Sequence, residues 1–368
     1  FRYGSPRRRR SQARHGRNGN HQRELDSGTR DSLQPVSPSN AVPGVARRGA
    51  RIPVIFSPTP EQRAIIEYPP LPLRVVAGAG TGKTTTIVHR LASLVTAGLS
   101  PERAIGITFT NKAAEELAAR LREVLPELAE EGREVEVTTY HGFAYGILQE
   151  FGAIIGVERD SEIIGPGYVR QLMQDAIADG SYSRIDLTAV PQRVDDAVEL
   201  GSQLTRNLCA PDALAGKPAD DDVAAARAEL AALITSYEDL KRELGVLDYA
   251  DLILLTHRLV DEHPEVAGRI RARYSVALLD EYQDTDPAQR ELLRTVFGDG
   301  FPVTAVGDAD QTIYEWRGAS LQNFADFPEH FPRDDGSPAE TLHPVSYTHL
   351  TLPTIQHWCR SRGWAGEW

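Results

Sequence analysis

Short apolar runs alternate along the chain with longer segments in which apolar residues recur every three or four positions. The short runs are bounded by polar loops, a pattern typical of buried strands, whereas the longer spacing indicates amphipathic helices. Five strands are predicted in this way: Leu73–Val76, Arg103–Thr108, Val135–Thr139, Val276–Leu279 and Val303–Val306. Because strands that alternate with helices form parallel sheets covered on both faces, the pattern predicts an α/β fold.

Between about residues 152 and 240 the pattern changes to helical periodicity rich in Ala, Leu, Asp and Glu, as in Asp221–Ile234. No strand-like run interrupts this stretch, so it predicts an all-helical subdomain inserted into the α/β domain. The expected domains are an α/β domain in two segments (51–151 and 241–332), the insertion (152–240) and two flanking segments (1–50 and 333–368).

The two ends of the chain lack the periodicity of packed elements. Residues 1–50 hold eleven Arg against three acidic residues, which predicts a disordered tail, with a solvated tail favoured over a nucleic-acid arm. Residues 333–368 predict an irregular end. Because no Met opens the chain and the string from Pro344 resembles a translated sequencing adaptor, both ends are candidates for non-native sequence, the second from about residue 344.

The net charge of −12 is unevenly distributed. The first 50 residues carry a local charge of +8, which leaves −20 (−12 minus 8) for the rest of the chain. An acidic body argues against indiscriminate nucleic-acid binding, so any such contact must be a local groove. No apolar run approaches membrane-spanning length, and Cys209 and Cys359 lack disulfide or metal-ligand spacing, which favours a cytoplasmic protein without membrane contact.

A glycine-rich turn follows the first predicted strand and ends in Gly82-Lys83-Thr84. Such a turn lets backbone N–H groups converge on one anion, and the helix expected from about Lys83 adds its positive end. Lys83 is placed to reach nucleotide phosphates and Thr84 to bind Mg²⁺. The strict phosphate-loop pattern requires Gly at position 77, where this chain has Ala. The flanking strand and helix nevertheless disfavour a chance match. The predicted nucleotide-binding residues are Ala77, Gly78, Ala79, Gly80, Thr81, Gly82, Lys83 and Thr84.

Two adjacent carboxylates, Asp280 and Glu281, end the predicted strand Val276–Leu279. This arrangement suits Mg²⁺ binding by Asp280 and activation of an attacking water by Glu281. A solvated acidic pair is the alternative, since such pairs are common. The next predicted strand is followed by Gln311, a neutral donor suited to sensing a γ-phosphate.

Two large aromatic residues and an arginine follow at Tyr314, Trp316 and Arg317. Aromatic rings beside a basic residue form a stacking platform for unpaired bases. Buried core aromatics are the usual alternative. Because the neighbouring residues are Gly, Glu and Arg and not aliphatic ones, the segment favours an exposed role in contact with single-stranded nucleic acid.

Seven segments, taken in order, resemble the motifs of UvrD/Rep-type superfamily 1 DNA helicases over about residues 54–332. They are Pro60–Gln62, Ala77–Thr84, Thr108–Leu117, Thr139–Phe143, Leu247–Leu252, Asp280–Thr285 and Val306–Ala319. The resemblance implies a RecA-like P-loop ATPase domain, an α/β parallel-sheet fold, with a helical insertion. It also implies an ATP-hydrolysing DNA helicase that uses ATP and Mg²⁺ and translocates 3′ to 5′ on single-stranded DNA, with 3′-tailed duplex DNA as a further partner.

The resemblance implies a role for individual residues as well. In the nucleotide site, Gln62 would read the adenine, Lys83 and Thr84 would hold phosphate and Mg²⁺, Asp280 would support the metal, Glu281 would be the catalytic base, and Gln311 would sense the γ-phosphate. On the DNA side, Phe109, Tyr314 and Trp316 would stack on bases, while Thr139, His141 and Arg317 would line the DNA path. Taken alone, His141 would be an ordinary polar loop residue.

One expected motif is missing. The family continues into a second RecA-like domain, whose first motif is Asn-Tyr-Arg-Ser-like and whose arginines neutralise charge on the γ-phosphate, but Thr341–Leu350 stands in its place. The sequence is therefore expected to be the ATP-binding half of a motor with almost no DNA-stimulated hydrolysis of its own. Two alternatives stay open: the motor part of a helicase-nuclease repair complex, and an ATP-dependent DNA-binding scaffold without translocation.

Overall fold

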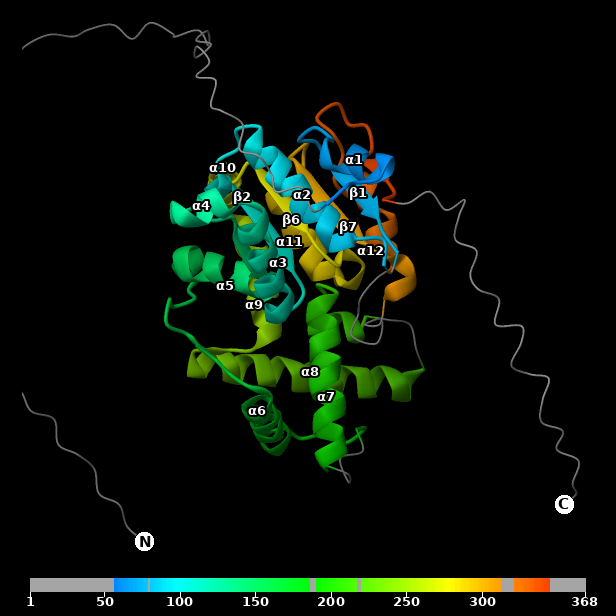
Figure 1. Cartoon of the computed structure of the whole chain (residues 1–368). Helices are drawn as coiled ribbons and strands as arrows, with labels where there is room; N and C mark the ends of the chain where they lie inside the picture. Colours follow the sequence, from blue (N-terminus) through cyan, green and yellow to red (C-terminus); the bar gives the residue numbers. More distant parts are fainter. Residues whose placement is uncertain (1–55, 79, 186–189, 217–219, 313–320, 345–368) are drawn as a thin grey trace, which may run out of the picture. The chain divides into compact units, whose positions relative to one another are not determined.

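The computed structural model describes residues 56–78, 80–185, 190–216, 220–312 and 321–344. In these residues six strands form one parallel sheet in the order β3, β2, β6, β7, β1, β8 (Figure 1). The strands are β1 (Leu73–Val76), β2 (Ala104–Thr108), β3 (Glu136–Thr139), β6 (Val276–Leu279), β7 (Val303–Gly307) and β8 (Glu340–Leu342). The predicted α/β fold with a parallel sheet is thereby confirmed.

The five predicted strands are all present, each within one residue of its predicted bounds. The sixth strand, β8, is not predicted by the sequence pattern and lies in the segment 333–368, for which that pattern indicates an irregular end. Glu340-Thr341-Leu342 is too short and too polar to read as a buried strand. It joins the sheet because β1 offers a parallel partner, with Leu73 opposite Glu340.

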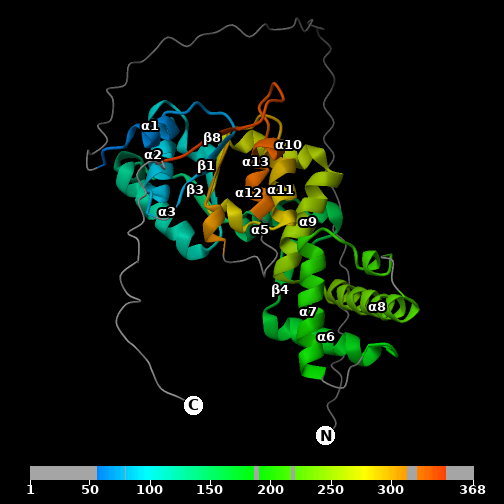
Figure 2. The ribbon, with the colours of Figure 1, turned by 90° about the vertical axis from the view of Figure 1, so that its right-hand side faces the viewer.

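Helices cover both faces of the sheet (Figures 1 and 2). Those of the α/β part are α1 (Pro60–Ile66), α2 (Lys83–Thr96), α3 (Asn111–Val124), α4 (Pro126–Glu130), α5 (Tyr140–Phe151), α9 (Tyr249–Glu262), α10 (Pro264–Arg273), α11 (Pro287–Phe297), α12 (Leu321–Ala325) and α13 (Phe327–His330). Val276 and Leu278 of β6 pack in one core with α1, α2 and α3. Ala277 and Leu279 pack in a second core with α5, α9, α10 and α11. The two-residue period of the strand therefore sends alternate side chains to opposite cores.

The insertion is built from α6 (Pro166–Asp179), α7 (Val190–Arg206) and α8 (Asp221–Leu244), drawn in green in Figure 1. It has a hydrophobic core of its own, which includes Met173 on α6, Val194 on α7 and Ile234 on α8. Two short strands, β4 (Glu162–Ile163) and β5 (Val246–Leu247), pair in parallel where the chain enters and leaves it. None of the helices in the described ranges is both long and apolar enough to cross a membrane.

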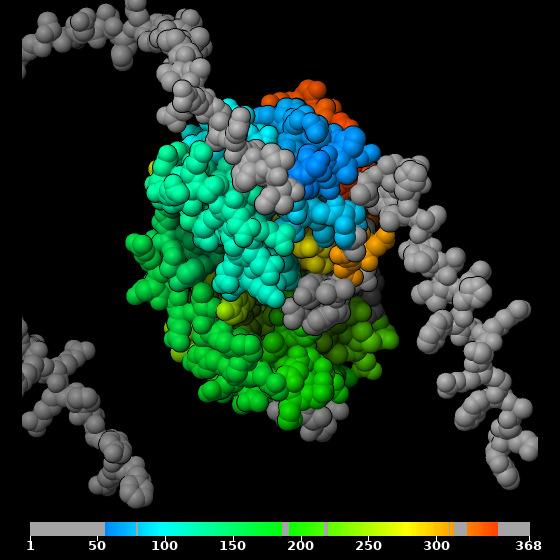
Figure 3. All heavy atoms as spheres, in the orientation of Figure 1, coloured from blue at the N-terminus to red at the C-terminus, as the bar shows by residue number. Residues whose placement is uncertain are grey.

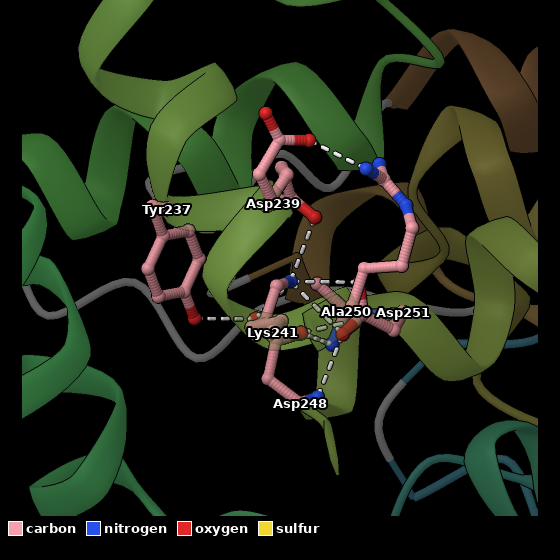
Figure 4. Close-up of polar contacts among 8 residues, drawn as sticks. Tyr237, Asp239, Lys241, Asp248, Ala250 and Asp251 are labelled. Atoms are coloured by element: carbon pink, nitrogen blue, oxygen red, sulfur yellow. Dashed lines mark hydrogen bonds and ion pairs between the residues drawn. The ribbon is translucent and has the colours of Figure 1, made fainter. Parts of the chain in front are cut away.

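A buried lysine joins α8 of the insertion to the start of α9. The Nζ atom of Lys241 lies 2.8 Å from Asp251, 2.9 Å from Asp248 and 3.0 Å from Glu238, and the Lys241 side chain is only 4% exposed (Figure 4). Burial lowers the pKa of Lys241, but the three carboxylates more than reverse this and hold it above its usual range. Asp248 and Asp251 also form the capping box of α9. The cluster thus fixes where the chain returns to the α/β part.

Candidate nucleotide and nucleic-acid site

The glycine-rich loop joins the carboxyl end of β1 to the first turn of α2. Gly80 and Gly82 have φ angles of 73° and 78°, in the left-handed region that favours glycine. The Thr81 hydroxyl donates a hydrogen bond of 2.8 Å to the Gly78 carbonyl, which closes the turn. Gly82 is the N-cap of α2 and has no side-chain acceptor for the first N–H groups, which leaves them suited to an anion. Ala79 lies outside the described residues.

Gln62 lies next to this loop because α1 begins with a capping box. The Gln62 backbone N–H donates to the Thr59 hydroxyl over 3.2 Å, and the Thr59 N–H donates to Gln62 Oε1 over 3.1 Å. The remaining amide donor, Nε2, lies 3.1 Å from the Thr81 carbonyl. The side chain predicted to read the base of a nucleotide therefore contacts the predicted phosphate loop directly.

Lys83 and the two carboxylates meet at the carboxyl edge of the sheet. They come together because β6, β7 and β1 are consecutive in the strand order. The Nζ atom of Lys83 lies 2.8 Å from Oε2 of Glu281. Glu281 has φ 50° and ψ 41°, a left-handed backbone that is rare for a residue with a side chain and marks a tightly constrained turn after β6.

Asp280 is a buried carboxylate whose environment fits a divalent cation. Its residue is 7% exposed, and its Oδ1 atom finds no hydrogen-bond partner within the described ranges. Burial, with a further contribution from the charge of Glu281, raises the pKa of Asp280 from 3.8 to about 6. A bound cation would supply the missing partner and the opposing charge.

The number of available ligands also bears on the metal. No group of three or more His, Cys, Asp or Glu side chains in the described part of the chain is arranged to hold a metal ion. Mg²⁺ commonly uses one or two protein ligands and completes its shell with water and substrate phosphates. Asp280 and the Thr84 hydroxyl suit that kind of site better than a closed protein cage.

Gln311, the predicted γ-phosphate sensor, is held at the end of β7 by its neighbour Asp308. Asp308 accepts a short hydrogen bond from the Gln311 amide through one carboxylate oxygen and bonds the Asp310 N–H with the other. Its own backbone N–H donates to Gln283 Oε1 over 3.1 Å. Gln283 and Asp308 are not among the residues predicted from sequence, since neither stands at a position that signals chemistry by its type alone.

A cleft of about 610 Å³ opens between the α/β part and the insertion. Phe109, His141 and Tyr249 line it from the α/β side, and Arg170 and Arg206 line it from the insertion. In the space-filling view the surface is hollowed between the cyan segment that includes α3 and the green insertion (Figure 3). Three aromatic rings in one cleft suit stacking on unpaired bases. Four aspartates line the same cleft, Asp195, Asp248, Asp284 and Asp286.

Tyr249 lines this cleft but is not among the DNA contacts predicted from the sequence. It is 59% exposed, and its ring lies 6.0 Å from that of His141 at an interplanar angle of 76°. Burial, assisted by the charge of Arg206, lowers the pKa of His141. In the sequence, Tyr249 stands directly after Asp248, the N-cap of α9, a position that does not by itself indicate exposure.

The other predicted DNA-contacting residues are only partly placed. The Thr139 hydroxyl accepts from the Gly142 N–H over 3.0 Å and so caps α5, which gives this residue a structural role in addition to the predicted one. Phe109 packs partly against the larger core while it lines the cleft. Tyr314, Trp316 and Arg317 lie outside the described residues.

The chain is similar to a family of known proteins. Residues 58–332 match the family model described as UvrD/REP helicase N-terminal domain. Over 265 residues the chain is 36% identical to ATP-dependent DNA helicase PcrA of Leuconostoc citreum, which covers 71% of this chain and 34% of that protein.

Two mycobacterial proteins are similar to the same extent. Over 285 residues the chain is 36% identical to ATP-dependent DNA helicase UvrD1 of Mycobacterium tuberculosis, covering 74% of this chain and 35% of that protein. Over 294 residues it is 34% identical to ATP-dependent DNA helicase UvrD2 of the same organism, covering 76% and 40%. The chain thus spans between about a third and two fifths of the length of these relatives.

Proposed function

Because the chain belongs to the UvrD/REP helicase family, we propose that its α/β part binds and hydrolyses ATP and that the whole protein is an ATP-dependent DNA helicase. One observation carries the proposal most directly. The Lys83 ammonium at the start of α2 and the Glu281 carboxylate after β6 meet at 2.8 Å at the mouth of the glycine-rich loop. A phosphate-binding cation and a candidate base are thereby brought to one point.

Each residue of the nucleotide site has a defined task in this proposal. Lys83 and the first N–H groups of α2 bind the β- and γ-phosphates, and Gln62 binds the adenine. Thr84 and Asp280 would hold Mg²⁺, which would neutralise charge on the phosphate oxygens. Glu281 accepts the proton of the attacking water, and Gln311 donates its amide to the γ-phosphate.

Glu281 has to change partners for this chemistry. While it is paired with Lys83, its Oε2 atom is engaged by an ammonium group and is a poor proton acceptor. Phosphate oxygens compete for the same ammonium group, so nucleotide binding releases the carboxylate for water. The left-handed backbone at Glu281 then keeps the carboxylate at the end of β6.

Single-stranded DNA is the proposed second ligand, with the cleft between the α/β part and the insertion as its path. Phe109 and Tyr249 offer rings for base stacking, beside His141. From the sequence, we propose Thr139, Tyr314, Trp316 and Arg317 as further DNA contacts. Arg170 and Arg206 on the insertion side are paired with Asp195 and Glu199, so DNA phosphates would have to displace these carboxylates to bind the two arginines. We propose movement in the 3′ to 5′ direction, 3′-tailed duplex DNA as a substrate, and a cytoplasmic location.

The experiment that tests this function uses the whole protein and compares phosphate release with and without oligo-dT. We expect strong stimulation by oligo-dT, loss of turnover in Glu281→Gln, and unwinding of a 3′-tailed but not a 5′-tailed duplex. ATP turnover that is unchanged by oligo-dT would contradict the helicase assignment. DNA-stimulated turnover without unwinding of either duplex would indicate a translocase that does not separate strands.

A further inference from the structure

The side chain of Gln283 bridges the two strand ends that carry the proposed catalytic residues. Its amide Nε2 donates to Glu281 Oε2 over 2.8 Å, and its Oε1 accepts the backbone N–H of Asp308 over 3.1 Å. The residue is 1% exposed, although it has no place in the chemistry described above. A buried amide that uses both ends in this way is strongly oriented.

One further contact fixes the orientation of this amide. Nε2 also lies 3.3 Å from Asp284 Oδ2, so the donor end faces two carboxylates while the acceptor end faces an N–H group. Rotating the amide by half a turn would set oxygen against carboxylates and nitrogen against a donor. At Gly307 a Cβ atom would lie 2.5 Å from Gln283 Oε1, so glycine is what lets β7 approach so closely.

The bridge extends from Glu281 to Gln311. Asp308, whose backbone N–H is bound by Gln283, accepts the Gln311 amide with its own side chain. Lys83, on the other side, is paired with Glu281. A continuous chain of polar contacts therefore runs from the phosphate-binding lysine through Glu281 and Gln283 to the predicted γ-phosphate sensor.

We propose that Gln283 is a positioning residue that couples Glu281 to Gln311, so that the catalytic base and the γ-phosphate sensor respond to a bound nucleotide as one unit. This proposal rests on the proposed function of the nucleotide site. When phosphate oxygens draw Lys83 away from Glu281, Gln283 is the neighbour that still holds the carboxylate. A shift of Gln311 toward a γ-phosphate reaches Glu281 through Asp308 and Gln283.

A double-mutant cycle tests the coupling in this chain by nucleotide binding. Displacement of fluorescent N-methylanthraniloyl-ADP by ADP and by ATPγS gives an affinity ratio for the wild type, Gln283→Met, Gln311→Leu and the double variant. We expect the change in this ratio in the double variant to differ by about threefold or more from the product of the changes in the two single variants. Effects that multiply within error would overturn the proposal.

Asn323→Leu is the matched control. Asn323 is a fully buried amide that hydrogen-bonds the Thr285 carbonyl and the Arg290 side chain, outside the bridge. Its loss should lower the melting temperature, yet its effect on the affinity ratio should multiply with that of Gln311→Leu. If Asn323→Leu departed from multiplication with Gln311→Leu as strongly as Gln283→Met does, the Gln283 effect would be a loss of packing. That result would overturn the proposal.

Thermal unfolding of every variant shows whether the fold is kept. If Gln283→Met does not fold, Gln283→Glu replaces it in the cycle, because Glu keeps the size and the acceptor for Asp308 but opposes the charge of Glu281. A wild-type chain that binds neither nucleotide would contradict the proposed function itself, whereas binding with multiplicative effects would contradict only the role of Gln283.

Discussion

Lys83 Nζ and Glu281 Oε2 lie 2.8 Å apart, although 198 positions separate the two residues in the sequence. Their side chains are 12% and 35% exposed, so the pair is partly shielded from water. The ion pair engages the ammonium group that Lys83 would need for phosphate and the carboxylate that Glu281 would need for water. In the proposed function, competition between Glu281 and phosphate for Lys83 links nucleotide binding to the release of the base.

This relationship predicts the behaviour of Glu281→Gln. The substitution removes the anion that competes for Lys83 and repels the γ-phosphate, so ATPγS should bind several-fold more tightly. Hydrolysis by the whole protein should fall by about 10²–10⁴-fold, the usual contribution of a general base. Calorimetric titration and phosphate release measure the two effects. As a control, Glu262→Gln, which breaks the surface pair with Arg258, should change neither; weaker ATPγS binding by Glu281→Gln would contradict the competition.

The sequence was most informative where the structure is local. The strands Leu73–Val76 and Val276–Leu279 and the loop at Gly80–Lys83 follow from apolar runs and glycine spacing alone, and they lie where predicted. The pairing of Lys83 with Glu281 and the bridge through Gln283 depend on the order of strands in the sheet, which no local pattern contains. The same holds for β8, which pairs in parallel with the neighbouring strand β1.

Tyr249→Ala should weaken binding of single-stranded DNA by about 1–3 kcal/mol, the usual cost of losing one base-stacking contact. Nucleotide affinity should stay unchanged, because Tyr249 lines the cleft and not the glycine-rich loop. Fluorescence anisotropy with labelled oligo-dT measures the loss. Tyr168→Ala, which removes another exposed tyrosine outside the cleft lining, is the control and should have no effect. Equal loss from both variants would mean that Tyr249 makes no specific contact.

Asp280→Asn should reveal the cost of the buried carboxylate through its pH dependence. The pKa of Asp280 is raised from 3.8 to about 6 in the folded protein. As the pH rises through this range, the unfolded chain loses the proton first, so the free energy of unfolding falls. In metal-free buffer the Asn variant should therefore be more stable than the wild type at pH 7, by at most about 3 kcal/mol. Its advantage should shrink as the pH falls from 6 to 4.

Urea unfolding with a chelator present measures this difference across the pH range. Addition of Mg²⁺ and ATPγS at pH 7 should then stabilise the wild type more than Asp280→Asn, since only the wild type keeps the carboxylate ligand. A stability difference that grows as the pH falls would contradict the assigned environment of Asp280.

Lys241→Met should destabilise the protein by about 3–5 kcal/mol, because it leaves buried carboxylates without their cation. Lys241 is 4% exposed among Glu238, Asp248 and Asp251, whereas Lys112 is 86% exposed and 4.0 Å from its partner Glu116. Lys112→Met should therefore change the free energy of unfolding by no more than about 0.5 kcal/mol. Urea unfolding of both variants measures the contrast, and equal effects would contradict the structural role of the Lys241 cluster.

The candidate site was predicted less evenly than the fold. Lys83, Asp280 and Glu281 could be proposed from the sequence because their residue types and their places after predicted strands indicate phosphate chemistry. Tyr249 could not be identified with the same rules, because an aromatic residue at a helix start is as often buried as exposed. Its 59% exposure and its ring contact with His141 exist only once α9 and α5 pack together.

Titration of Mg²⁺-ATPγS into the wild-type chain and into Lys83→Ala tests the central claim, a nucleotide site on the glycine-rich loop, most directly. Hydrogen bonds to a charged group contribute about 1.5–3 kcal/mol each, so the loss of Lys83 should weaken binding by about 10- to 150-fold. Lys112→Ala, on the exposed face of α3, should bind as the wild type does. The predicted result is measurable binding by the wild type and by Lys112→Ala, with weakening of this size only in Lys83→Ala. Unchanged affinity in Lys83→Ala would contradict the nucleotide site.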